Sequence, residues 1–387
     1  MTTATATRTA TITGSAGHLA DQIGWVAAHL PTRPAVPVLV GVRLSATPDG
    51  AVTARGTDYE VWACADLDVD TDGLVDVVLP GRLLSALLSS LPRHLMVTLA
   101  VDHDQVRVTC GPTRASLRTL PLEEYPDFPA WPEPLGTVDA HDLAQAVSRI
   151  VAAASTDVEL VALTGIHLAF GPQGMQAEAT DRYRFALATA PWTPTLDGDD
   201  TTHTALVPAL TLHQTTKALA KSETVNIGRD GDTVSLTGDG RRLMTRLLDG
   251  EFPTWERMHT LAQGQDIEVD VAITALRDTI KRVSLFAERT TPLRISITGE
   301  GLVVRSGSED LGAVAEDVDA HVETDRDLVV HVQPHFLTEA LAAIPGETVR
   351  LSFGHPEKPF LARPGDEEQS GLMWLVMPVR QPTGGTR

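Results

Sequence analysis

Cysteine and long hydrophobic runs are nearly missing from this 387-residue chain. Only Cys64 and Cys110 occur, both in apolar, strand-like segments, and two thiols are too few for a disulfide framework or a zinc cluster. We expect both thiols to be buried and reduced. No apolar run approaches the roughly 20 residues of a membrane span, and residues 1–14 lack the charged and apolar regions of a secretion signal. These absences predict a soluble, cytoplasmic protein.

Lysine is scarce as well. Four lysines stand among the 31 basic residues, so arginine carries nearly all of the positive charge. The 51 acidic residues bring the net charge to -20, which favours solubility and argues against a protein that coats nucleic acid with its whole surface. A local basic surface is compatible with this balance.

Signals of catalysis are lacking too. The chain has no Gly-x-Ser-x-Gly elbow and no Gly-x-x-x-x-Gly-Lys phosphate loop. His331 and His335 have the four-residue spacing of a zinc site, but no glutamate follows the first histidine and Pro334 starts a new helix between them. The run 228–240 lacks the alternating oxygen ligands of a calcium loop and is typical of hairpin turns. The sequence predicts no enzyme activity, no cofactor and no metal site.

An internal repeat runs through the chain. Segments 15–31, 139–155 and 272–289 share apolar residues spaced four and then three positions apart, which predicts one apolar stripe on a helix in each. About 60 residues after each stripe begins, a proline follows a short apolar strand, at Pro80, Pro208 and Pro334. Proline is well tolerated in the first turn of a helix, so a second helix is predicted to start at each.

Strand-like runs fill the space between these helices. Residues 36–46, 51–69, 105–120 and 160–170 are examples, and turn signals at hairpin distances separate the runs. Linker-like stretches at 126–136 and 259–266 divide the chain. We predict an α+β fold of three repeated domains, each with two helices packed on antiparallel sheets, at 1–133, 134–262 and 263–387.

Three such units suggest a curved array with sheets on one side and helices on the other. If the edge strand of the last unit pairs with the first unit of a second chain, two chains close into a ring whose hole is lined by helices. A basic lining would suit duplex DNA bound through phosphates without base readout. Solvated helix faces explain the same charges, and nearby aspartates dilute the signal. The basic helix residues are Arg82, Arg149, Lys217, Lys221, Arg277, Lys281, Arg282 and Arg289.

Seven segments then carry a resemblance to a known family. The chain resembles the bacterial β sliding clamp, the processivity subunit of the replicative DNA polymerase, in an actinobacterial-like form. The resemblance implies a head-to-tail homodimer that closes as a ring around double-stranded DNA and tethers the polymerase, the clamp loader and repair proteins. The segments are LPTRPAVPVLVGVRL (30–44), LPGRLLSALLSSLP (79–92), SLRTLPLEEYPDFP (116–129), LTGIHL (163–168), ATDRYRFAL (179–187), TRLLDGEFPTW (245–255) and LVMPVR (375–380).

The resemblance also implies a pocket between the second and third units that accepts partner peptides of the type Gln-Leu-any-Leu-Phe. An apolar floor with a few polar groups at its rim suits such a peptide. By pattern alone, Leu163, Val376 and Val379 would be strand core, whereas Met377 and Pro378 fit a core less well because proline interrupts a ladder. Matched by motif, the pocket comprises Leu163, Thr180, Arg182, Tyr183, Arg184, Phe185, Pro253, Arg257, Met258, Gln333, Phe336, Val376, Met377, Pro378, Val379 and Arg380.

For DNA, the resemblance marks Arg33 and Arg82 beside helix ends that face the hole. Helix position alone adds Arg149, Lys217 and Lys221, and ordinary surface residues are the alternative for all five. For ring closure, position in the chain indicates a strand of the first unit that meets the end of the first helix of the third unit. The residues expected at this dimer interface are Ala115, Leu117, Ser284 and Leu285.

The sequence departs from the family pattern in and near the pocket. Phe185 stands where leucine is usual, and Gln381 follows Arg380 where an apolar residue is usual. Residues 259–260 read His-Thr rather than Leu-Pro, and Leu210 replaces a basic residue. A diverged second clamp copy, whose altered pocket confers resistance to a clamp-binding inhibitor, is therefore an alternative. An open, monomeric scaffold that does not bind DNA is another.

Overall fold

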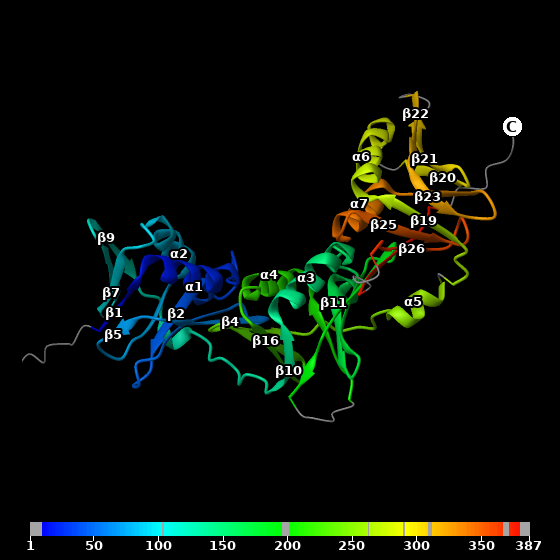
Figure 1. Ribbon diagram of the computed structural model, residues 1–387. Helices are drawn as coiled ribbons and strands as arrows, with labels where there is room; N and C mark the ends of the chain where they lie inside the picture. Colours follow the sequence, from blue (N-terminus) through cyan, green and yellow to red (C-terminus); the bar gives the residue numbers. More distant parts are fainter. Residues whose placement is uncertain are drawn as a thin grey trace, which may run out of the picture. The chain divides into compact units, whose positions relative to one another are not determined.

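The computed structural model describes residues 10–102, 104–195, 201–261, 263–288, 291–308, 312–366 and 371–379 (Figure 1). Arg380, which the sequence places in the pocket, lies outside the described residues. The chain groups into two compact units. The first draws on Met1–Ala140 and Ala218–Leu247, and the second on His141–Lys217 and Leu248–Arg387.

Helix pairs form in each predicted repeat. The first helices bury the predicted stripes, because Leu19, Leu143 and Leu276 are fully buried. Ser15 caps the first helix, its side-chain oxygen accepting a hydrogen bond from the backbone N–H of His18 at 3.2 Å. The described helices are α1 (Ala16–Ala28), α2 (Gly81–Ser90), α3 (Ala140–Ile150), α4 (Ala209–Leu219), α5 (Trp255–Leu261), α6 (Ile273–Val283) and α7 (Pro334–Ala343).

Pro80 and Pro208 each end a strand and directly precede a helix, and only Pro334 of the three starts one, which corrects the prediction that each starts a helix. Pro80 is the N-cap of α2 and Pro208 is the last residue of the strand before α4, whereas Pro334 is the first residue of α7. An N-cap has extended rather than helical backbone, and proline at the first helical position has no N–H to leave unpaired.

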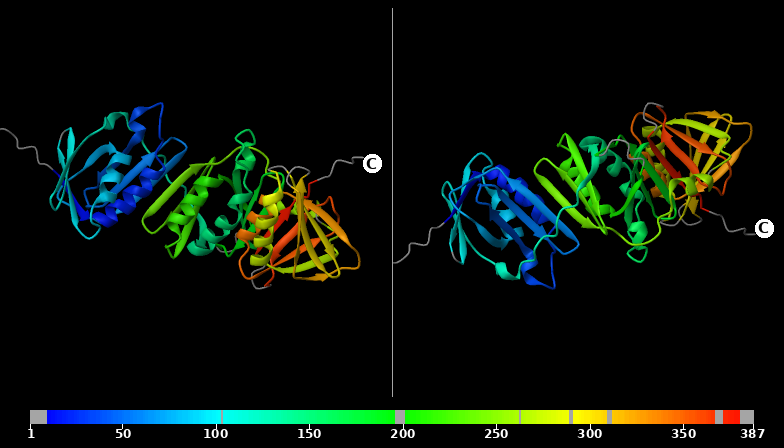
Figure 2. Two further views of the ribbon diagram at one scale, coloured as in Figure 1. Left: turned by 90° about the horizontal axis from the view of Figure 1, so that it is seen from above. Right: turned by 90° about the horizontal axis from the view of Figure 1, so that it is seen from below.

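Two sheets organise the first unit (Figure 1). The smaller has the order β5-β1-β7-β8-β9, and the larger runs β10-β16-β17-β18-β4-β3-β2-β6 within this unit. Helices α1 and α2 pack against each other on the strands, as the views in Figure 2 also show. The strands are β1 (Thr11–Ser15), β2 (Gly41–Ala46), β3 (Val52–Thr57), β4 (Val61–Leu67), β5 (Asp70–Thr71), β6 (Asp76–Pro80), β7 (Met96–Asp102), β8 (Gln105–Cys110), β9 (Thr113–Arg118), β10 (Pro134–Asp139), β16 (Thr224–Asp230), β17 (Thr233–Gly238) and β18 (Arg241–Arg246).

Two sheets also organise the second unit. One has the order β15-β11-β12-β13-β27-β26-β25-β19-β23, and the other has the order β22-β21-β20-β24. The two-residue β14 (Thr193–Pro194) follows β13 along the chain. The strands are β11 (Gly165–Gly171), β12 (Gly174–Thr180), β13 (Arg184–Ala190), β15 (His203–Pro208), β19 (Ile267–Ala272), β20 (Leu293–Thr298), β21 (Gly301–Ser308), β22 (Gly312–Val318), β23 (Ala320–Glu323), β24 (Leu328–Val332), β25 (Thr348–Phe353), β26 (Phe360–Pro364) and β27 (Leu372–Val376).

Strand pairing joins consecutive repeats. β4 of the first repeat pairs antiparallel with β18 of the second, with Ala63 opposite Leu243. β13 of the second repeat pairs antiparallel with β27 of the third, with Phe185 opposite Leu375. Sheets therefore run across the expected repeat limits, because each junction satisfies the backbone hydrogen bonds of what would otherwise be an edge strand.

Three segments differ from their predicted structures. Residues 36–46 and 160–170 begin with short 3-10 helices rather than strand, namely η1 (Pro37–Val40) and η4 (Val161–Thr164). The stretch 259–266, predicted as a linker, begins inside helix α5. The remaining 3-10 helices are η2 (Leu122–Glu124), η3 (Val151–Ala153) and η5 (Ser284–Phe286).

The core confirms the expectation for cysteine. Cys64 on β4 and Cys110 on β8 are both buried free thiols, and burial raises the pKa of Cys64.

In the second unit, Phe353 stacks on Phe360 with ring centroids 4.7 Å apart, and Trp374 is fully buried. Among the described residues, no helix has the length and apolar character needed to cross a membrane.

Candidate functional site

The turn between β12 and β13 has a fixed conformation. The Thr180 hydroxyl donates to the carbonyl of Arg184 at 2.6 Å and accepts from the N–H of Arg182 at 3.2 Å. The Asp181 carboxylate accepts from the N–H groups of Tyr183 and Arg184 at 3.0 and 3.1 Å. Arg182 has a φ of 82°, a left-handed conformation that costs energy for a residue with a side chain. The turn thereby holds Tyr183 in solvent, where its side chain is 54% exposed.

The side chain of Arg184, the last residue of this turn, is buried. Its side chain is 8% exposed and forms ion pairs with Asp181, at 3.1 Å, and with Glu339 on α7. The guanidinium lies over the ring of Phe336, 5.0 Å from its centroid, and Tyr183 stacks on the same ring at 5.7 Å. A buried guanidinium needs such partners, because an unpaired charge is costly away from water. Arg184 thus ties the second repeat to α7 of the third.

A cavity of about 430 Å³ opens beside this network. It contains Arg182, Tyr183 and Arg184 of the predicted pocket, together with Asp181 and Glu339. Leu163 does not line it, whereas Leu160 does, because η4 turns the chain there and Leu163 donates its N–H to the Leu160 carbonyl at 2.8 Å. The other lining residues are Val151, Ala152, Ala154, Ser155, Thr156 and Asp157.

The pocket predicted from the sequence did not include Asp181, Glu339 and Leu160, which line the cavity. Asp181 stands inside the quoted ATDRYRFAL segment, so its position was available. Glu339 follows Phe336 by three residues on α7, the spacing that puts two side chains on one helix face. No sequence signal indicates Leu160.

Phe185 lies on the opposite face of β13 from Arg184, because successive strand residues alternate sides. Its ring is fully buried among Leu187, Leu361 and Leu375. Phe252, Trp255 and Met258 cover this cluster from the segment that includes α5. The ring of Phe185 is therefore covered by α5 and the segment that precedes it.

Val376 is also fully buried and lies opposite Arg184 in the sheet. It is strand core, the interpretation that its pattern alone favoured. Met377 is partly exposed and donates its N–H to the carbonyl of Tyr183 at 2.8 Å, and Val379 donates to the carbonyl of His331 at 2.7 Å. Pro378 follows the end of β27 and is buried, so it belongs to the packed structure despite ending the ladder.

The remaining predicted pocket residues belong to α5 and α7 or to the residues just before these helices. Pro253 is partly buried just before α5, and Arg257 is exposed on that helix. Gln333 is the N-cap of α7 and Phe336 lies in its first turn. The predicted set is therefore split into a groove around Arg184 and a closed cluster around Phe185.

The predicted DNA-binding residues fall into two classes. Arg33, Lys217 and Lys221 have exposed side chains. Arg82 is also exposed, although its guanidinium donates to the carbonyl of Leu30 at 2.7 Å.

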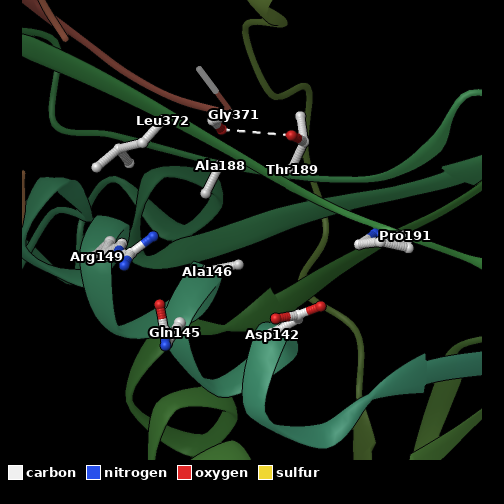
Figure 3. Close-up of a pocket in the computed structure, with 9 residues that line it drawn as sticks. All are labelled: Asp142, Gln145, Ala146, Arg149, Ala188, Thr189, Pro191, Gly371 and Leu372. Atoms are coloured by element: carbon white, nitrogen blue, oxygen red, sulfur yellow. Dashed lines mark hydrogen bonds between the residues drawn. The ribbon is translucent and has the colours of Figure 1, made fainter. Parts of the chain in front are cut away.

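Arg149 differs from those four residues. Its guanidinium lies in a cavity of about 450 Å³, where Figure 3 shows it with Asp142 and Gln145 of α3 and with Leu372. Burial lowers the pKa of Arg149, and the negative charge of Asp142 opposes that effect. Arg149 is therefore a partly buried cavity residue rather than an extended surface cation.

The predicted ring-closure residues also differ among themselves. β9 is the last strand of its sheet, but the Leu117 side chain is only 6% exposed and belongs to the core of the first unit. Ala115 is partly exposed on the same strand. In the second unit, Ser284 and Leu285 lie in η5 just after α6, where Leu285 is 77% exposed. The Leu117 side chain is therefore not available for contact, whereas the backbone edge of β9 and the exposed side chains of Arg114 and Ser116 are.

Comparisons with known proteins cover nearly the whole chain. Three family models match in order: the DNA polymerase III beta subunit N-terminal domain at residues 11–129, its central domain at 137–254 and its C-terminal domain at 258–380. The chain is 37% identical over 372 residues to a beta sliding clamp of Streptomyces coelicolor, covering 94% of this chain and 97% of that protein. It is 33% identical over 368 residues to the beta sliding clamp homolog GriR of Streptomyces muensis, with the same coverage of both.

Solved structures agree on the fold. The DNA polymerase sliding clamp of Bacillus subtilis superimposes with a TM-score of 0.87 at 24% identity, over 97% of this chain and 100% of that one. The Pseudomonas aeruginosa DnaN sliding clamp bound to griselimycin gives a TM-score of 0.88 at 22% identity, with the same coverage. The three matching domain models and the whole-length relatives lead to one conclusion: the chain belongs to the DNA polymerase III beta subunit family, the bacterial β sliding clamps.

Proposed function

We propose that this chain is a DNA sliding clamp that encircles duplex DNA and tethers the replicative polymerase and repair proteins. The observation that carries the proposal is the match of all three clamp domain models, in order, along one chain. In this role the protein acts by topology and tethering, without chemistry of its own, in the cytoplasm. The three clamp domains would occupy residues 1–133, 134–262 and 263–387.

Two copies would close head to tail into a ring. The strands β9 and β22 each end a sheet, and an unpaired strand edge offers backbone donors and acceptors to a second chain. Leu285, exposed on η5 of the second unit, supplies an apolar contact near that closure. We expect light scattering to give twice the 41.4 kDa mass of one chain. A monomer at micromolar concentration would instead support the open scaffold.

DNA would pass through the ring and be held by phosphate contacts alone. Arg33, Arg82, Lys217 and Lys221 are exposed cations that suit this contact, whereas Arg149 is partly buried. A protein loaded on a nicked circular duplex by its loader should co-elute with the DNA in gel filtration. Cutting the circle should release it, whereas a protein that binds without encircling would stay bound after the cut.

Partners would dock by a Gln-Leu-any-Leu-Phe type peptide at the groove around Arg184. The cavity beside Tyr183 and Arg184, rimmed by Leu160, supports this placement, because it combines polar groups with an apolar wall. A labelled Gln-Leu-Ser-Leu-Phe peptide should show saturable binding by fluorescence anisotropy. Deletion of the chain after Met377 should abolish the binding.

A second candidate is a diverged clamp copy with an altered pocket that resists a clamp-binding inhibitor. The observation that favours it is the fully buried Phe185, which Phe252, Trp255 and Met258 cover. Griselimycin, the ligand of the Pseudomonas aeruginosa clamp structure, is a suitable probe. Weak griselimycin binding by the native chain that tightens in Phe185→Leu would favour this candidate, and tight binding by the native chain would exclude it.

A further inference from the structure

A buried carboxylate lies beneath the first residue of α5. Glu178 on β12 is 2% exposed, and its Oε1 accepts a hydrogen bond from the backbone N–H of Trp255 at 2.8 Å. Its Oε2 lies 2.8 Å from Nδ1 of His167, which faces Glu178 across the β11–β12 pair. A buried carboxylate needs partners of this kind, because an unpaired charge is costly in the interior.

This carboxylate is well placed to hold a helix. The first N–H groups of a helix have no partner within it, and negative charge is favourable at that end. Trp255 is the first residue of α5, and its N–H is one of these groups. His167 extends the arrangement, because its ring stacks on Phe252 at 5.4 Å with an interplanar angle of 14°.

The helix held in this way covers Phe185. The Trp255 ring lies 5.8 Å from the Phe185 ring, and Phe252 lies 6.2 Å from it. Trp255 also stacks on His259 one turn later at 5.1 Å, which keeps its ring against α5. Met258 completes the cover. These partly exposed side chains lie over a phenylalanine that has no exposed surface of its own.

We propose that α5 is a closable cover over the apolar end of the partner-peptide site, and that Glu178 is the positioning residue that holds it shut. The inference rests on the proposed peptide site. The groove around Arg184 is open, while the cluster around Phe185 on the other face of β13 is closed. A peptide that ends in two apolar residues can bury them against Phe185 only if α5 moves off that ring. Glu178 therefore determines the fraction of molecules in which α5 is open and the site can bind the apolar end of the peptide.

The experiment compares Glu178→Gln with native protein. The amide keeps the shape of the side chain and removes the charge that favours the N-terminus of α5. Hydrogen exchange in residues 255–261 should become faster. Affinity for the Gln-Leu-Ser-Leu-Phe peptide should increase about fivefold, because the apparent dissociation constant falls as the competent fraction rises. Affinity for a Gln-Leu-Ser-Ala-Ala peptide should not change.

Two further variants keep the test decisive. Trp255→Ala removes the covering ring itself and should tighten the Leu-Phe peptide to a similar extent, with no further gain when it is combined with Glu178→Gln. Glu251→Gln is the matched control, because it removes an exposed carboxylate that precedes α5 and lies outside its first turn, and it should change neither exchange nor affinity.

Each other outcome overturns a defined part of the inference. Unchanged exchange of α5 in Glu178→Gln would remove the positioning role of Glu178. Faster exchange with unchanged or weaker binding of the Leu-Phe peptide would show that α5 is not a cover. A third outcome is that the protein dimerises and is retained on circular DNA, but no peptide binds the native chain or any variant. This outcome would refute both the proposed peptide site and the inferred cover, and it would leave the clamp function intact.

Discussion

The chain builds the same turn twice, at residues 57–61 and 180–184, and a cavity of about 430 Å³ lies beside the second. In both turns a threonine hydroxyl accepts from the N–H two residues later, and an aspartate carboxylate accepts from the next two N–H groups. The third residue has positive φ in both, 74° at Tyr59 and 82° at Arg182. The backbone is thus shared, and the side chains that it presents account for the difference.

The fourth residue of the first turn is the charged Glu60, whereas the fourth residue of the second turn is the aromatic Tyr183. Glu60 forms an exposed ion pair with Arg246 at 3.7 Å, and the Arg246 guanidinium lies over Trp62. At the second turn, Tyr183 takes the place of Glu60, and Met377 donates to its carbonyl as Arg246 does to that of Glu60. An exposed ion pair covers the first junction, while the buried Arg184 and the ring of Phe336 meet at the second.

The segments that cross the outer faces of the two sheets differ as well. Phe128 and Trp131 lie under the guanidinium groups of Arg55 and Arg242, so cation–π contacts fix this chain segment along the first sheet. The equivalent segment at the second junction is helix α5, anchored at its first residue by Glu178. Glu178 therefore holds the start of α5, in addition to the packing of Trp255 and Met258 on the Phe185 cluster.

The largest effect on the free energy of unfolding is expected when the ring of Phe185 is removed from its buried cluster. Phe185→Ala should lower the free energy of unfolding by about 3–5 kcal/mol, because it removes a fully buried ring and leaves a cavity. Tyr183→Ala, two residues earlier but half exposed, should cost less than about 1 kcal/mol. Urea denaturation measures both. Equal costs would show that Phe185 is not packed as described.

The next effect is a pH dependence to which His29 at the first junction contributes strongly. Burial lowers the pKa of His29 from 6.5 to about 4, although Asp58 of the first turn opposes the shift. The unfolded chain therefore binds more protons between these values, and stability decreases as pH falls from about 6.5 to about 4 and is level below that.

The pH effect should amount to about 3 kcal/mol. Urea denaturation at pH 7 and at pH 4.5 should show most of the loss in native protein and little of it in His29→Phe. A loss of the same size in His29→Phe would assign the pH dependence to other groups.

A smaller effect separates the two arginines at the junctions. Arg184→Met should cost about 2 kcal/mol, because it leaves Asp181 and Glu339 without their partner, and the partial exposure of Glu339 reduces the penalty. Arg246→Met should cost less than about 1 kcal/mol, because both of its carboxylate partners are largely exposed. Chemical denaturation of the two variants checks the order, and a reversal would refute the contrast between the junctions.

The smallest effect concerns the second residue of the second helix in the same two repeats. This residue is Arg82 in α2 and Leu210 in α4, and both are exposed. Arg82→Ala should reduce the salt dependence of DNA binding by about one phosphate contact, and Leu210→Arg should increase it by about one. Binding to short duplexes over a range of salt concentrations gives the slope. Arg149→Ala is the control and should leave the slope unchanged.

Much of the fold could be predicted from the sequence, because the spacing of apolar residues over short stretches shows the repeat. The stripes beginning at Leu19, Leu143 and Leu276 are fully buried in the structure, as their spacing predicts. The prediction for the site was less complete. Arg184 and Phe185 were assigned to one pocket, although neighbours on a strand face opposite sides of a sheet. Helix α5 was missed because residues 259–266 are polar and resemble a linker.

By itself the sequence determined the three repeats and the family, since each depends on patterns of residues close together in the chain. Only the tertiary structure decided what meets the two faces of β13. Pairing of β13 with β27 brings Leu375 beside Phe185, and packing of α7 brings Glu339 to Arg184. The burial of Glu178 beneath α5 depends on the same long-range contacts. Local patterns fix which residues share a face, but distant segments determine whether that face becomes a core, a groove or a cover.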